Sequence, residues 1–253
     1  MSPQGERIAA LRAEIGALER AGRAGGAASF PFGVDSIDRR LAAGGLAACA
    51  LHEIAGASPG LADEAAATLF AAAAAVRAGS EGEGHVLWAL VRRDLFAPGL
   101  AQAGLAPERV LYAECRRDEE VLAVMEEGLR HGGLCAVVGE VGRVPMAATR
   151  RLQLAAEEGG TMALMLKRWR RAGEDPLALP SAAVTRWRIA PAPSALLPAP
   201  GVGRARWRLE LARQRGGEPF TLFVEAPDEK ARLALAPAAA DRAAPANGAR
   251  QAA

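Results

Sequence analysis

The stretch with the spacing of a phosphate site covers residues 44–78. An apolar segment, residues 46–54, leads into a Gly/Ser/Pro turn, residues 56–60, and an alanine-rich segment of helical character follows, residues 62–78. Strand, glycine turn and helix is the order of a phosphate-binding loop, in which backbone N–H groups at a helix N-terminus hold phosphate oxygens. The layout therefore points to nucleotide chemistry.

The side chains that perform this chemistry are missing from the turn. Counted from Gly56, the pattern G-x-x-x-x-G-K-[ST] requires lysine at position 62 and serine or threonine at position 63, where the chain has Ala62 and Asp63. The carboxylates of Asp63 and Glu64 suit a helix first turn but bring negative charge to the place of a phosphate. We therefore expect no bound cofactor. The degenerate loop consists of Gly56, Ser58, Gly60, Ala62 and Asp63.

A second set of candidate residues is a basic block between residues 161 and 217. It holds 11 basic and 3 acidic residues, whereas residues 1–160 hold 16 basic and 21 acidic residues. Cations bind phosphates and exposed indoles stack on bases, so the block suits single-stranded DNA; an acidic protein partner or a plain solvated surface fits it as well. The residues concerned are Lys167, Arg168, Trp169, Arg170, Arg171, Arg186, Arg188, Arg204, Arg206 and Arg208.

The tryptophans of the basic block need not face solvent. Side chains alternate along a strand, so Trp187 and Trp207 lie opposite their arginine neighbours, and both can belong to the core. Trp169 stands beside a loop, and we expect it to be the most exposed of the three.

The histidines and cysteines lack the partners that a catalytic or metal site needs. The histidines are isolated and the cysteines lie far apart, so no metal-ligand spacing and no nucleophilic triad occurs. We expect structural or exposed histidines, reduced cysteines in the core of a cytoplasmic protein, and no metal. These residues are His52, His85, His131, Cys49, Cys115 and Cys135.

The elements that must position these residues alternate between strands and helices. Residues 134–138 form a continuous apolar run, typical of a central parallel strand, and Asp118 and Pro145 can each open a helix. Later strands follow one another without helices, so the sheet should finish antiparallel; they cover residues 184–189, 205–211 and 220–225. The prediction is a doubly wound α/β fold, with a mostly parallel sheet, helices on both faces and antiparallel strands at the C-terminal edge.

Composition divides the 253 residues into a core and two appendages. Residues 1–26 form an amphipathic helix and a glycine hinge, residues 27–235 the core, and residues 236–253 a tail too poor in large apolar residues to pack, hence disordered. No run reaches the length of a membrane span. The helix carries one apolar stripe, which fits either a partner chain or the protein's own sheet: Ile8, Leu11, Ile15 and Leu18.

The order of motifs resembles the ATPase core of the RecA recombinase family over residues 30–225. The residues that carry the resemblance are Gly-Val-Asp-Ser-Ile-Asp at 33–38, Gly44-Gly45-Leu46, His52-Glu53-Ile54-Ala55-Gly56, and Gly104-Leu105 with Val110-Leu111. Within that group the chain is most similar to the ImuA family, RecA-like accessory proteins of bacterial SOS mutagenesis whose phosphate loop is eroded.

The resemblance implies a role in a damage-induced mutasome. The expected partners are an ImuB-like inactive Y-family polymerase, an error-prone polymerase III alpha-type subunit and RecA, with association with the nucleoid after DNA damage. A non-catalytic adaptor fits this role. The alternative is a DNA-dependent ATPase whose nucleotide site is rebuilt from other residues.

Two further ATPase positions of the RecA pattern are altered. The strand that should end in a magnesium-holding aspartate reads Val137-Val138-Gly139-Glu140, which places Gly139 at that position and turns Glu140 to the opposite face. After the second strand, where the resemblance implies a catalytic glutamate, Asp94 is either an acid in the cleft or a solvated turn residue. We therefore expect no catalytic residues and no hydrolysis.

Overall fold

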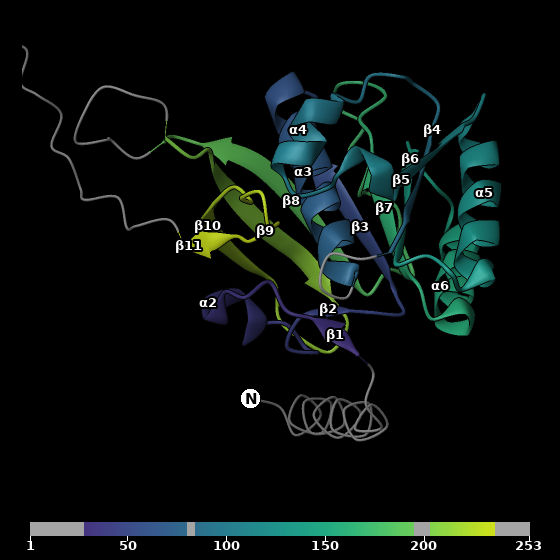
Figure 1. Cartoon of the computed structure of the whole chain (residues 1–253), viewed down its shortest axis with the longest axis horizontal. Coiled ribbons are helices and arrows are strands. Elements are labelled where there is room, and N and C mark those ends of the chain that lie inside the picture. Colours follow the sequence, from purple (N-terminus) through teal and green to yellow (C-terminus); the bar gives the residue numbers. More distant parts are fainter. Residues whose placement is uncertain (1–27, 80–83, 195–202, 236–253) are drawn as a thin grey trace, which may run out of the picture.

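A computed structural model describes residues 28–79, 84–194 and 203–235. Within them, one nine-stranded sheet carries helices on both faces (Figure 1). The predicted fold class is confirmed. The N-terminal helix and the C-terminal tail predicted for residues 1–26 and 236–253 lie outside the described residues.

The sheet has the order β11-β10-β9-β8-β3-β7-β6-β4-β5. Its six strands from β8 to β5 are parallel, and β9, β10 and β11 each run antiparallel to the preceding strand. The strands are β3 (Leu51–Gly56), β4 (Val86–Leu90), β5 (Val110–Glu114), β6 (Ala136–Val141), β7 (Met162–Lys167), β8 (Thr185–Ala192), β9 (Arg206–Gln214), β10 (Phe220–Glu225) and β11 (Ala234–Leu235). Residues 168–184 return the chain without a helix to the start of β8, which is parallel to β3, and the antiparallel part predicted for the C-terminal edge begins at β9.

Two pairs of helices cover opposite faces of the sheet. α3 (Leu61–Ala78) and α4 (Ala97–Gln102) share a core with one face, and α5 (Asp118–His131) and α6 (Met146–Gly159) with the other (Figure 1). The alanines of α3 let its backbone lie close to the sheet, and the acidic first turn of α5 suits the helix dipole. Short elements complete the fold: α2 (Asp35–Asp38), η2 (Pro107–Arg109), and a two-stranded sheet of β1 (Ser29–Phe30) and β2 (Leu46–Ala47).

An aromatic cluster anchors α3 to the antiparallel half of the sheet. Trp187 on β8 contacts Phe32, Phe70 and Phe220, with ring centroids 5.4–6.0 Å apart. Trp187 is fully buried and Trp207 almost so, because alternation along β8 and β9 turns both indoles toward α3. The expectation that these tryptophans can belong to the core is confirmed.

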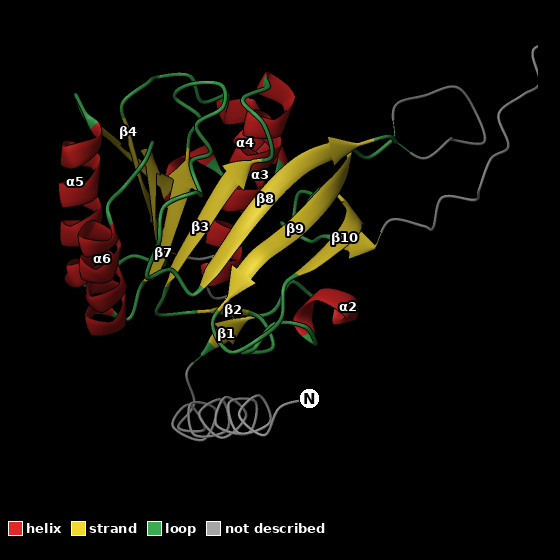
Figure 2. Ribbon diagram, turned by 180° about the vertical axis from the view of Figure 1, so that it is seen from behind, coloured by secondary structure: helices red, strands yellow, loops and turns green. Residues whose placement is uncertain are grey.

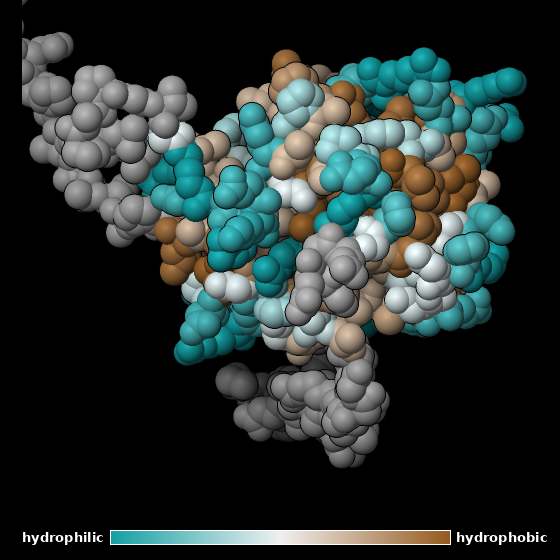
Figure 3. Space-filling view, viewed as in Figure 1, coloured by the Kyte–Doolittle hydropathy of each residue, from teal (hydrophilic) through white to brown (hydrophobic). Residues whose placement is uncertain are grey.

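None of the described helices covers the other face of β8, β9 and β10. Figure 2 shows this face open, with α5 and α6 standing over the parallel half of the sheet. At the far edge, β5 exposes Leu111 and Tyr112, and Figure 3 shows apolar surface at that end of the molecule. Among the described helices, none is long and apolar enough to cross a membrane.

His52 occupies a closed hydrogen-bond network inside the fold. Its Nδ1 lies 2.8 Å from the hydroxyl of Thr185, and its Nε2 lies 2.9 Å from the carbonyl oxygen of Ala47. Trp187 donates its Nε1–H to the same hydroxyl, so that hydroxyl can give its own proton to Nδ1 while Nε2–H donates to Ala47. Burial lowers the pKa of His52 from 6.5 to about 4, against the opposing effect of the Ala47 hydrogen bond. The ring is therefore neutral at pH 7 and structural.

The neutral state of His52 makes stability depend on pH. The unfolded chain takes up the proton at higher pH than the folded chain, so we expect the free energy of unfolding to fall by about 2 kcal/mol between pH 7 and pH 5. Urea denaturation at a series of pH values measures this. His52→Gln should flatten the profile in that window, whereas His131→Gln, which changes an exposed histidine, should leave it intact. An equal slope in wild type and His52→Gln would contradict the assignment.

Candidate functional site

The phosphate-loop layout predicted from the sequence is present at the carboxyl end of β3. The strand ends at Gly56, and α3 begins at Leu61, directly after a turn in which the Gly60 N–H donates to the Ser58 hydroxyl at 3.1 Å. Gly56 is required there because a Cβ would lie 2.9 Å from the carbonyl carbon of Asp63 in the first turn of α3. Strand and helix are thus packed backbone to backbone.

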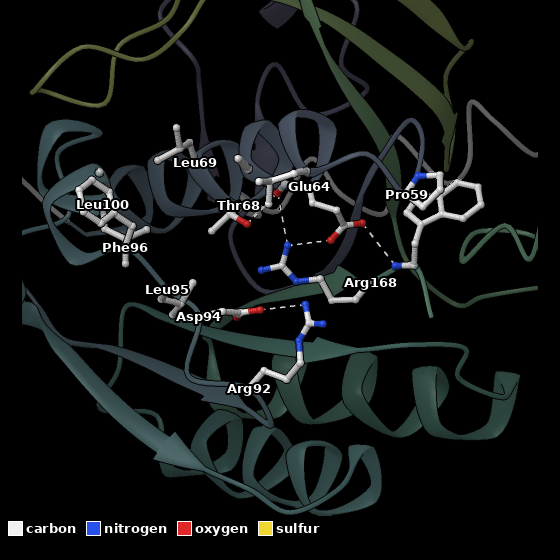
Figure 4. Close-up of a pocket in the computed structure, with 14 residues that line it drawn as sticks. Pro59, Glu64, Thr68, Leu69, Arg92, Asp94, Leu95, Phe96, Leu100 and Arg168 are labelled. Atoms are coloured by element: carbon white, nitrogen blue, oxygen red, sulfur yellow. Dashed lines mark hydrogen bonds and ion pairs between the residues drawn. The ribbon is translucent and has the colours of Figure 1, made fainter. Parts of the chain in front are cut away.

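The neighbouring strand β7 delivers a buried arginine to this loop. Arg168 donates through Nε to Glu140 and through Nη1 to Glu64, each at 2.9 Å. The indole N–H of Trp169 donates to the Gly56 carbonyl at 2.9 Å, and the Trp88 indole donates to the second oxygen of Glu140 at 2.8 Å. Figure 4 shows Arg168 reaching Glu64 on α3. We call Arg168, Glu64, Glu140, Trp88 and Trp169 the Arg168 cluster.

The charge of Arg168 is fixed by its two carboxylates. Burial alone would lower the pKa of the guanidinium, but Glu140 and Glu64 outweigh it and raise the pKa above its usual value. Two carboxylates around one guanidinium leave the cluster with a formal charge of −1. The only cation of the cluster is therefore already bound by the protein's own anions.

The position of Glu140 corrects one expectation from the sequence. Gly139 faces α5, where a Cβ would lie 2.1 Å from the sulfur of Met125, so position 139 does not face the loop. Glu140 lies on the face of α3 and joins the cluster instead. The prediction that Gly139 and Glu140 lie on opposite faces of β6 is confirmed, but the assignment of Gly139 to the face of the loop is wrong. Both faces of this strand are buried, so its sequence does not indicate which residues face the loop helix. A carboxylate does stand at this strand end.

A half-open cavity of about 360 Å³ adjoins the Arg168 cluster. Figure 4 shows its walls: apolar side chains, and Asp94 ion-paired with Arg92 at 2.8 Å. Leu61 and Phe96 line it with 86% and 70% of their surfaces exposed. The sequence suggested Asp94 for this cleft but did not predict that Leu61 and Phe96 would be exposed there. Hydrophobic periodicity does not show that the loop with Phe96 lies beside the first turn of α3.

Part of the basic block is buried in ion pairs. Arg186 contacts Glu53 at 2.6 Å, and Arg188 contacts Asp175 at 2.5 Å. Burial lowers the pKa of Lys167 to about 8, against the opposing charge of Glu53. These side chains lie toward the face of α5 and α6, away from Arg168. The residues of the basic block therefore do not form one continuous surface: Arg168 lies on the side of α3, and Lys167, Arg186 and Arg188 lie on the side of α5 and α6.

The remaining arginines are more accessible. Arg170 pairs with Asp118, and Arg171 has 80% of its side chain exposed. On the open face of β9, Arg208 lies opposite Phe223 of β10, whose surface is 51% exposed. Phe223 was missed from the sequence, although alternation in Phe220–Glu225 was the available signal. Arg204 and Arg206 lie at the same end of this face.

Other candidate residues stay apart. Among the described residues, no group of three or more His, Cys, Asp and Glu could hold a metal ion. The cysteines are free, but the prediction that they lie in the core is wrong for Cys49, which is exposed; Cys115 and Cys135 are half-buried. The stripe Ile8, Leu11, Ile15 and Leu18 lies outside the described residues.

Comparison with known proteins identifies the family. No protein-family model matches the chain. Two relatives named Protein ImuA, from Caulobacter vibrioides strains NA1000 / CB15N and ATCC 19089 / CIP 103742 / CB 15, are each 40% identical over 202 residues, covering 77% of this chain and 82% of the relative. The chain belongs to the ImuA family. The family membership predicted from the sequence is confirmed. The Arg168 cluster is therefore part of the loop region of an ImuA-family protein.

Removing Arg168 should destabilise this ImuA-family fold strongly. Arg168→Leu leaves Glu140 buried without its cation, so we expect the free energy of unfolding to drop by about 3–5 kcal/mol in urea denaturation at pH 7. Arg171→Leu is the matched control, because its exposed ion pair should change stability by no more than about 0.5 kcal/mol. Similar losses for both variants would show that the cluster contributes little.

Proposed function

We propose that this chain is a non-catalytic RecA-like adaptor within the SOS mutagenesis system of the ImuA family. It supports error-prone translesion synthesis by contacting an ImuB-like inactive Y-family polymerase, an error-prone polymerase III alpha-type subunit and RecA. The observation that carries the proposal is the Arg168 cluster, which occupies the end of the phosphate-loop helix with paired protein charges.

The cluster argues against nucleotide binding on electrostatic grounds. A phosphate at the start of α3 meets Ala62 in place of a lysine, and the carboxylates of Asp63 and Glu64 lie in the same helical turn. Arg168 already shares its charge with Glu140 and Glu64, and giving that charge up to a phosphate would weaken a buried pair at a cost of several kcal/mol. The loop therefore keeps the fold of a nucleotide site and opposes its ligand.

Exposed apolar surface supports a protein-binding role. Leu61 and Phe96 line one cavity, and Leu111 and Tyr112 lie on β5, an edge strand of the described sheet. Edge strands with apolar residues and exposed apolar patches are typical of protein contacts. An adaptor needs more than one such surface.

The second candidate function is a DNA-dependent ATPase with a rebuilt site. Two observations favour it: Glu140 faces the loop helix, and Asp94 lines the adjoining cavity. Both carboxylates are paired with arginines, so they would have to be released before they could hold magnesium or activate water.

Nucleotide titration separates the two functions. We expect calorimetry with ATP and magnesium to show no saturable heat at tens of micromolar protein, because the loop has no lysine and the charge of Arg168 is already shared by Glu140 and Glu64. Co-purification gives a second test: a tagged chain should co-purify with the ImuB-like protein from DNA-damaged cells equally well with and without ATP. A third test is mutagenesis in cells, where Asp94→Ala should leave the damage-induced mutation frequency unchanged. Saturable binding together with hydrolysis that Asp94→Ala abolishes would establish the ATPase instead.

We also propose that single-stranded DNA contacts the open face of β9 and β10. Phe223 offers a ring for base stacking, with Arg208 opposite and Arg204 and Arg206 beside it. Arg208 and Arg204 pair with Glu210 and Glu225 at 2.9 and 3.2 Å. These pairs are half-exposed, so phosphates can replace the carboxylates at a lower cost than at the buried Arg168.

DNA binding on this face should depend on the ring and on salt. Fluorescence anisotropy with a labelled oligothymidine should show affinity that falls steeply with salt, and Phe223→Ala should cost about 1–3 kcal/mol. Phe96→Ala, which removes a similarly exposed ring elsewhere, is the matched control. Absence of binding at low salt, or equal losses for both variants, would assign the face to an acidic protein or to plain surface.

A further inference from the structure

A second cavity lies at the end of the sheet opposite the Arg168 cluster. It has a volume of about 280 Å³. Small and aliphatic residues, among them Leu41, Ala47 and Val184, form one part of its lining, and polar residues such as Glu157 and Arg215 form the rest. The aliphatic part of the lining offers a surface for aliphatic side chains.

The walls of this cavity are held in place by buried amides. Gln214 accepts a hydrogen bond from the Ala42 N–H at 3.1 Å and donates to the Arg40 carbonyl at 2.8 Å. Gln153 of α6 accepts from the Leu51 N–H at 2.9 Å on the other side. The cavity is therefore preformed, and filling it needs no rearrangement of these elements.

The chain enters the described structure beside this cavity. β1 pairs with β2 so that Ser29 lies opposite Ala47, a residue of the cavity wall, and Ala28 accepts a hydrogen bond from the Ala48 N–H at 2.8 Å. Gly45, another wall residue, is packed against the backbone of Phe30, because a Cβ there would lie 2.6 Å from it. The described part of the chain therefore begins, at Ala28, next to the opening.

The segment that precedes Ala28 carries the apolar stripe of Ile8, Leu11, Ile15 and Leu18. Residues 19–27 separate Leu18 from Ala28 and can span roughly 30 Å when extended, so the stripe reaches the cavity easily. Residues 21–27 include three glycines, which permit the chain to turn back.

We propose that the N-terminal segment docks its aliphatic stripe into this cavity of its own chain. The sequence left two surfaces open for the stripe, a partner and the protein's own core, and the position of Ala28 beside the cavity decides for the core. A short tether gives the stripe an effective concentration in the millimolar range at the cavity, which a separate chain does not reach. The proposal is independent of nucleotide and DNA binding.

Cys49 provides a probe, because this exposed free thiol lies in the cavity lining. In a Cys115→Ser/Cys135→Ser background, Leu18→Cys should form an intramolecular disulfide with Cys49 under mild oxidation, since docking brings the two Cα atoms within bonding range of about 7 Å. Arg20→Cys is the matched control, closer to the tether but on the opposite face of the predicted helix. We expect the stripe position to react at least about ten times faster.

Each other outcome overturns the proposal. Equal rates for the two positions would mean that the segment is merely tethered. Disulfide-linked dimers on a non-reducing gel would place the stripe on a second copy.

A measurement without disulfides checks the same contact. In the Cys115→Ser/Cys135→Ser background, Cys49 should react with a thiol reagent about ten times faster after Leu18→Asp, because the charged side chain prevents docking. Arg20→Asp should leave the rate unchanged. An equal rate for Leu18→Asp and its parent would show that the segment does not cover the cavity.

Discussion

The guanidinium of Arg168, shared between Glu64 and Glu140, determines how the loop end of this fold is built. It links three elements that are far apart in sequence, since Glu64 lies on α3, Glu140 on β6 and Arg168 directly after β7. A buried carboxylate is tolerated only with a cation or several hydrogen-bond donors. Glu140 has both, from Arg168 and from the Trp88 indole.

The same interaction sets the electrostatics of the strand, turn and helix at the end of β3. The backbone order of strand, turn and helix is present at Gly56 and Leu61, and acidic side chains with one buried arginine surround it. The arginine that follows β7 offsets part of the charge of two carboxylates that would otherwise repel each other more strongly. A fold can in this way keep its architecture while the chemistry of its site is replaced, because function resides in the site and not in the fold.

The arginines of the basic block fall into two groups according to how deeply they are buried. Arg168 and Arg186 are bound to carboxylates inside the protein, where separating the charges is costly. Arg171 and Arg208 lie in exposed pairs, which solvent and salt weaken. Only the more exposed arginines are available to a charged partner. The number of arginines in residues 161–217 is therefore larger than the number that contributes positive charge to the surface.

The sequence by itself determined the family, the alternation of strands and helices, and the loss of the loop lysine at Ala62. These follow from local patterns: apolar runs, glycine turns and the spacing counted from Gly56. Only the tertiary structure decided that Glu140 faces α3, that Arg168 is buried, and that Phe223 is exposed on an open sheet. The reason is physical: a strand's alternation fixes which residues share a face, whereas the neighbours packed on that face, often a hundred residues away, fix its burial and its charge partners.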